Sequence, residues 1–118
     1  MATMHSVPRS EWRQFFDRMS TALLRGKRAE IEVASLETGD QIIAEWIPMI
    51  GVTYDSRDDL VDVALDRTDH LILHPEEIVV EEGTEGLMSI AVTAVDGTRH
   101  IVRLKEPLML PAGESVKT

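Results

Sequence analysis

One change in hydrophobic period, near residue 29, limits what this chain can fold into more than any other feature. Before it, residues 10–25 repeat large apolar side chains at helical spacing, and Ser10 and Gly26 suit the start and stop of a helix. After it, apolar residues alternate with polar ones in short segments separated by turn signals. The pattern predicts one amphipathic helix followed by sheet. Its apolar stripe is Trp12, Phe15, Phe16, Met19 and Leu23.

The strands are expected in several short segments between residue 29 and residue 104. Residues 58–66 also fit a helical stripe, but their β-branched side chains favour a strand. Asp96-Gly97 is a typical two-residue hairpin loop, which predicts Thr93 opposite His100. In that register both faces of the hairpin mix apolar and polar residues, which favours a sheet covered on both sides.

These elements predict an α+β fold. We expect an N-terminal amphipathic helix packed on a strongly bent, mainly antiparallel sheet of about six or seven strands, similar to a small barrel or roll. A length of 118 residues suits one domain. The expected organisation is a flexible N-terminus at 1–9, a single domain at 10–111 and a flexible tail at 112–118.

Composition excludes several kinds of site. The chain has no cysteine, so it has no disulfide, no thiolate metal ligand and no cysteine nucleophile. No apolar run approaches the ~20 residues of a membrane span, and the first residues lack the apolar core of a signal peptide. A cytoplasmic protein without a membrane span is therefore expected.

Charge is distributed unevenly along the chain. Residues 1–28 hold six Arg or Lys and two acidic residues, whereas residues 29–118 hold six and nineteen. The net charge of −9 argues against nucleic-acid binding, since attraction to phosphates supplies most non-specific affinity. The basic segment is expected to dock on its own acidic domain; the alternative is a basic face for an acidic partner, formed by Arg13, Arg18 and Arg25.

The segment DHLILHP at 69–75 raises the question of a metal site, because it places His70 and His74 four residues apart. On a helix the two side chains would share one face, but on a strand they lie ~13 Å apart, too far for one ion. Pro75 disfavours helix at His74, so a strand is expected. A metal would need His100 or a carboxylate from another strand, and no metal or cofactor is expected.

No other motif indicates chemistry. The acidic turn DSRDD at 55–59 lacks the spacing of a calcium loop, and the chain has no glycine-rich phosphate loop and no nucleophile elbow. The apolar run at 46–50 belongs either to the core or to a docking surface. Its candidate interface residues are Trp46, Ile47, Met49 and Ile50.

Several phrases of the sequence resemble a known family. EWRQFFDRMS, the stretch from RAEIEVASLETGD to DDLVDVAL, DHLILHP and the closing PLMLP are similar to the bacterial family catalogued as domain of unknown function 5335. The resemblance covers about residues 10–111. It implies a small stand-alone bacterial protein and carries no activity or catalytic residue.

Three functions remain open. The favoured one is a non-catalytic binding or interaction module, whose partner is another protein or a second copy in a homo-oligomer. The alternatives are a small metal-dependent or hydrolytic enzyme using His70, His74, His100 and carboxylates, and a nucleic-acid-associated small barrel.

Overall fold

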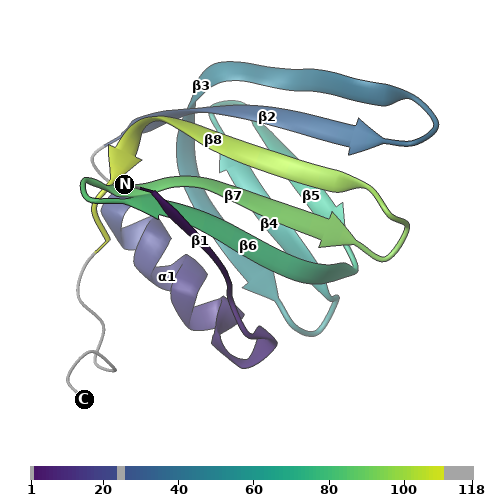
Figure 1. Ribbon diagram of the computed structural model, residues 1–118, viewed down its shortest axis with the longest axis horizontal. Coiled ribbons are helices and arrows are strands. Elements are labelled where there is room, and N and C mark those ends of the chain that lie inside the picture. Colours follow the sequence, from purple (N-terminus) through teal and green to yellow (C-terminus); the bar gives the residue numbers. More distant parts are fainter. Residues whose placement is uncertain (1, 24–25, 111–118) are drawn as a thin grey trace.

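The computed structural model describes residues 2–23 and 26–110 and contains one antiparallel sheet and one short α-helix (Figure 1). The sheet has eight strands in the order β1-β6-β7-β8-β2-β3-β4-β5. In chain order the elements are β1 (Thr3–Ser6), the 3-10 turn η1 (Arg9–Glu11), α1 (Trp12–Ala22), β2 (Lys27–Ser35), β3 (Gly39–Asp55), β4 (Leu60–Leu65), β5 (Thr68–Leu73), β6 (Pro75–Gly83), β7 (Gly86–Ala94) and β8 (Arg99–Leu108).

The sheet bends at β3, which is 17 residues long. Its first part pairs with β2 as far as Met49, and its second part pairs with β4 from Met49 onward. Register shifts interrupt both pairings, and Trp46 between them has a φ of 52°. Such bulges increase local twist and bend a strand. As a result, β4 and β5 lie behind β7 and β8 (Figure 1).

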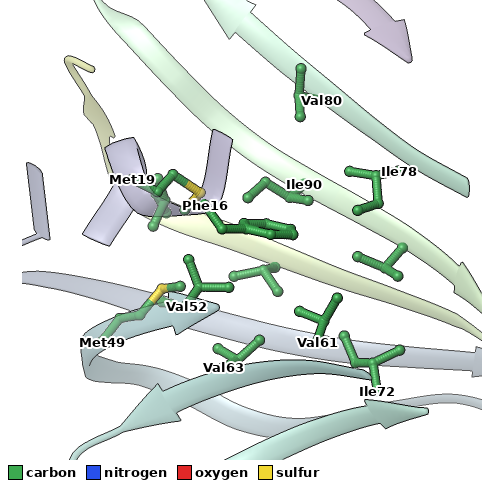
Figure 2. Close-up of a cluster of buried hydrophobic side chains, with 14 of the residues drawn as sticks. Phe16, Met19, Met49, Val52, Val61, Val63, Ile72, Ile78, Val80 and Ile90 are labelled. Carbon is green, nitrogen blue, oxygen red and sulfur yellow. The ribbon is translucent and has the colours of Figure 1, made fainter. Parts of the chain in front are cut away.

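Helix α1 occupies the place beside the second part of β3 that β2 has left. Its buried face packs into the core between the two parts of the sheet, where Phe16 lies between Ile90 and Val52 (Figure 2). The hydroxyl of Ser20 accepts a hydrogen bond from Val52 N at 3.0 Å and donates one to Val52 O at 2.7 Å. One helical side chain thus satisfies the backbone groups that a neighbouring strand would otherwise bind.

Ser20→Ala is expected to lower the free energy of unfolding by about 1–3 kcal/mol, because it leaves two half-buried backbone groups of Val52 without a partner. Chemical unfolding measures this loss. Thr21→Ala is the matched control, since the Thr21 hydroxyl is exposed and bonds only within the helix. Equal stability of the two variants would contradict the role given to Ser20.

The expected α+β class is confirmed, with an antiparallel sheet and one helix. Two details were wrong: the described residues form eight strands rather than six or seven, and the sheet is open rather than barrel-like. Residues 3–6, expected in a flexible end, form β1 and pair with β6. Ser10 lies in η1 instead of capping the helix, and Glu11 precedes α1 without a side-chain cap. The predicted tail at 112–118 lies outside the described residues.

The predicted register of the β7–β8 hairpin was wrong by one residue. Val92, rather than Thr93, lies opposite His100, because residues 95–98 form a longer loop than Asp96-Gly97 alone. In the observed register Ile90 faces Val102 and shares the buried side with Val92. One face of the hairpin is therefore mainly apolar, with His100 at its end near the loop, and the other is largely polar, where the shifted register mixed them. The strand preferred for 58–66 is confirmed as β4.

Candidate functional site

Bending of the sheet brings His70 of β5 against His100 of β8. Nε2 of His70 lies 2.9 Å from Nδ1 of His100, and the ring centroids are 5.0 Å apart. The two strands are four places apart in the sheet order, so flat sheet geometry would not place these rings in contact. Both side chains come from the half-buried positions of their strands.

A chain of hydrogen bonds fixes the orientation of the His100 ring. Thr98 Oγ1 lies 2.7 Å from Asp96 Oδ1 and 3.0 Å from His100 Nε2. An ionised carboxylate only accepts, so the Thr98 hydroxyl donates to Asp96 and accepts from His100 Nε2–H. His100 Nδ1 is then unprotonated and accepts the hydrogen bond of His70 Nε2–H. The network assigns one tautomer to each ring.

Burial keeps both rings neutral near pH 7. It lowers the pKa of His70 to about 4, and a charge on His100 would lower it further. Burial also lowers the pKa of His100, while the negative charge of Asp96 acts in the opposite direction. Hydrogen bonds from the Thr98 backbone and hydroxyl hold the pKa of Asp96 below its usual range. The pair is therefore two neutral imidazoles beside one carboxylate.

His74 belongs to a different cluster. Its Nδ1 lies 3.5 Å from Asp59 Oδ2, and its side chain is largely exposed. Asp59 Oδ1 also accepts from the Tyr54 hydroxyl at 2.8 Å and lies 3.4 Å from Arg9 Nη1. The hydrogen bond from Tyr54 lowers the pKa of Asp59. The pKa of Tyr54 is raised, mainly by burial and to a smaller extent by the same hydrogen bond. His70 and His74 thus have separate surroundings.

This second cluster holds the start of the helix against two turns. The Arg9 guanidinium donates to Pro75 O at 3.0 Å and lies 4.3 Å from the centre of the Trp12 ring. Asp59 and His74 both adopt left-handed backbone conformations, with φ of 51° and 54°. His74 N donates to Asp59 O at 2.8 Å, which ties these two residues together. No pattern considered in the sequence predicted this cluster; the available signal was the only tyrosine of the chain, which stands next to the acidic turn.

In the acidic turn after β3, the carboxylate of Asp55 is hydrogen-bonded by backbone N–H groups of the same turn. Asp55 Oδ1 accepts from the backbone N–H groups of Arg57 at 2.9 Å and Asp58 at 3.3 Å, as in a turn that caps itself. Within residues 2–23 and 26–110, no group of three or more His, Asp or Glu side chains is arranged to hold a metal ion. The turn is thus a solvated one.

A pair of carboxyl groups lies on the outer face of β4 and β5. The pKa of Asp62 is raised to about 6, mainly by burial and to a smaller extent by a hydrogen bond with Asp69. Oδ1 of Asp62 is buried without a hydrogen-bond partner in the described part of the chain. Asp62 therefore stays protonated to a higher pH than ordinary surface carboxylates do.

Residues 29–48 form an arm in which β2 pairs with the first part of β3, along the top of Figure 1. Pairing with β4 begins only at Met49, so the far edge of residues 39–48 has no neighbouring strand among the described residues. Ile42 and Ile43 on this edge are 50% and 47% exposed, and Leu36 at the tip is fully exposed. The arm contains no Lys or Arg; its acidic residues are Glu30, Glu32, Glu37, Asp40 and Glu45.

The predicted interface residues have different environments. In the run at 46–50, Trp46 and Ile47 are half-buried, Met49 lies in the core and Ile50 is 59% exposed. Only Ile50 therefore offers a large exposed apolar surface.

The basic residues predicted to form an interface lie on or near the helix. Arg13 is exposed and Arg18 is half-buried on α1, whose apolar face packs against the sheet. Arg25 lies outside the described residues. The helix thus docks on its own domain while two of its basic side chains remain at the surface.

One cavity has a volume of about 640 Å³, and neither His70 nor His100 lines it. It opens between β1, α1 and the β6–β7 turn. Its charged walls mix both signs, with Arg18 and His5 beside Glu11 and Glu82, so they select no single class of ligand. No helix in residues 2–23 and 26–110 is long and apolar enough to cross a membrane.

Comparison with known proteins covers nearly the whole chain. Residues 3–113 match the model of the family of unknown function DUF5335. The chain is 39% identical over 112 residues to an uncharacterized protein of Aquifex aeolicus (strain VF5), covering 94% of this chain and 99% of that protein. No solved structure matches significantly. The extent of both matches shows that the chain belongs to the family of unknown function DUF5335.

Proposed function

We propose that this protein is a non-catalytic interaction module, and that its partner is a second copy of itself bound along the open edge of the arm. One observation carries the proposal: residues 39–48 have an unpaired backbone edge with two half-exposed isoleucines at its centre. Proteins usually shorten, twist or charge such an edge, because it is a ready template for another strand. At its usual rise per residue, this edge is about 34 Å long.

Charge along the edge is compatible with two-fold pairing. Directly opposite residues of an antiparallel pair share a face, so a two-fold axis normal to the sheet sets one residue against its own copy. With Ile42 on that axis, Asp40 faces Ala44 and Glu45 faces Gly39 of the copy. The uncharged residues 41–43 then pair among themselves, and no acidic side chain directly opposes another.

Electrostatic repulsion between the two acidic arms opposes this dimer. Glu30 and Glu32 are partly compensated, since Arg103 Nη1 lies 3.2 and 2.8 Å from their carboxylates. The other acidic residues of the arm have no basic residue within the arm itself. Salt screens such repulsion between exposed charges, so association should strengthen as ionic strength rises.

Native mass spectrometry and sedimentation of untagged protein test the proposal. We expect a dimer whose dissociation constant falls with added salt. The double variant Ile42→Glu, Ile43→Glu should weaken it at least tenfold, because it places further negative charge at the centre of the pairing. Val95→Glu, which alters an exposed apolar residue in the β7–β8 loop and outside the open edge of β3, is the matched control and should leave the dimer intact.

A wild-type monomer at high concentration, or a dimer unchanged in the double variant, would overturn the proposal. Thermal unfolding of each variant separates loss of association from loss of fold. The cytoplasmic location stays a prediction, which cell fractionation of the untagged protein can test.

A further inference from the structure

We propose that His70 Nε2 and His100 Nδ1 together bind one transition-metal ion of the Zn²⁺ or Cu²⁺ class. The two nitrogens are 2.9 Å apart and face each other from strands that are distant in the sequence. Around a tetrahedral ion, bonds of about 2.0–2.1 Å place two ligand nitrogens about 3.3–3.4 Å apart. The rings therefore need to separate by about 0.5 Å or less to admit an ion.

The surroundings of His100 support a ligand role for Nδ1. A metal-bound histidine normally donates its other ring N–H to a carboxylate or another acceptor, which fixes the tautomer. Here His100 Nε2 bonds to Thr98 Oγ1, and Thr98 bonds to Asp96. This chain leaves the lone pair of Nδ1 directed at His70. Because both rings are neutral near pH 7, metal binding requires only that the His70 proton move from Nε2 to Nδ1, with no charged imidazolium to deprotonate.

The two imidazole ligands determine which ions can bind and how many coordination positions of the ion stay free. Imidazole suits zinc, copper and nickel, whereas magnesium and calcium prefer oxygen ligands. The described residues supply no third side chain arranged for coordination. Two positions on the ion are left for water or for a small donor ligand, so the affinity is expected to be below that of a structural zinc site. Copper should bind more tightly than zinc.

Calorimetric titration of the untagged, chelator-treated chain with zinc chloride or copper sulfate tests the inference. We expect one ion per chain and at least a tenfold loss of affinity in both His70→Ala and His100→Ala. His74→Ala is the matched control, since its exposed side chain lies in the Asp59 cluster. Thr98→Ala should weaken binding several-fold while retaining the stoichiometry, because it removes only the group that orients His100.

A second readout does not depend on the variants being folded. In ¹⁵N spectra of the wild-type imidazole rings, zinc should shift Nε2 of His70 and Nδ1 of His100 and leave the His74 ring unchanged. Absence of binding would overturn the inference. So would binding that survives both His70→Ala and His100→Ala, or zinc-induced shifts confined to other histidines.

Discussion

Phe16→Ala is expected to lower the free energy of unfolding by about 3–5 kcal/mol, the cost of deleting a buried aromatic ring and leaving a cavity. Phe16 is fully buried and extends from α1 into the cluster between the two parts of the sheet (Figure 2). Domains of this size are stable by only about 5–15 kcal/mol, so the variant should lose a large share of its stability. Its Tm should fall by about 10–20 °C.

The same helix provides the control for this prediction. Thr21→Ala removes a hydroxyl and a methyl group from the exposed side of α1, where substitutions usually change stability by less than about 0.5 kcal/mol. Urea unfolding of both variants at one pH measures the difference. If Phe16→Ala were as stable as Thr21→Ala, the helix would not be part of the core.

Local patterns of the sequence predicted the helix and most strands because each depends on neighbouring residues. Trp12, Phe16 and Met19 recur at helical spacing, and the structure buries all three. The alternation of Val61 and Val63 with Asp62 predicted which side of β4 faces the core, and this was confirmed. In the sequence of any strand with one covered face, apolar residues that face the core alternate with polar residues that face solvent.

Long-range features were not predictable in the same way. The β7–β8 register depends on the loop, where Ala94 N donates to Thr98 O and Gly97 N donates to Ala94 O. A two-residue loop and a four-residue loop both accommodate Asp96-Gly97, and the choice between them shifts every cross-strand pair. Strand β1 was missed because its four residues are all exposed and carry no alternation.

The histidine pair shows the same limit. Spacing alone predicted that His70 and His74 would not share a site, and they are apart. The contact between His70 and His100 depends on how far the sheet bends, and that depends on bulges inside β3. A local signal for the hydrogen-bonded chain was present in the spacing of Asp96, Thr98 and His100, which are two residues apart. Alternate residues near the start of a strand point to the same side of the sheet.

Acidification should destabilise the metal-free protein through His70, in a window set by two pKa values. The unfolded chain takes up a proton as the pH falls through the ordinary histidine pKa of 6.5, whereas folded His70 resists protonation until about pH 4. Between these values the unfolded state binds more protons, so the free energy of unfolding falls as the pH falls. The stabilising contribution is complete above about pH 6.5 and is at most about 3 kcal/mol.

Asp62 acts in the opposite direction over nearly the same range. Its folded pKa of about 6 lies above its ordinary value of 3.8, so the folded state binds the extra proton as the pH falls. Acidification then stabilises the folded state through this group. The response of the wild-type protein contains both effects, and Asp62→Asn removes the second one.

Urea unfolding at pH 7.5 and pH 5, in a buffer containing a chelator, measures the histidine contribution. In the Asp62→Asn background, His70→Phe should reduce the stability lost between the two pH values by about 1–3 kcal/mol. Comparing the two pH values within each protein removes the cost of losing the bond to His100. His74→Phe, at an exposed position, is the matched control because it leaves the contact between His70 and His100 intact. If His70→Phe kept the full pH dependence, the histidine contact between β5 and β8 would not be what acid disrupts.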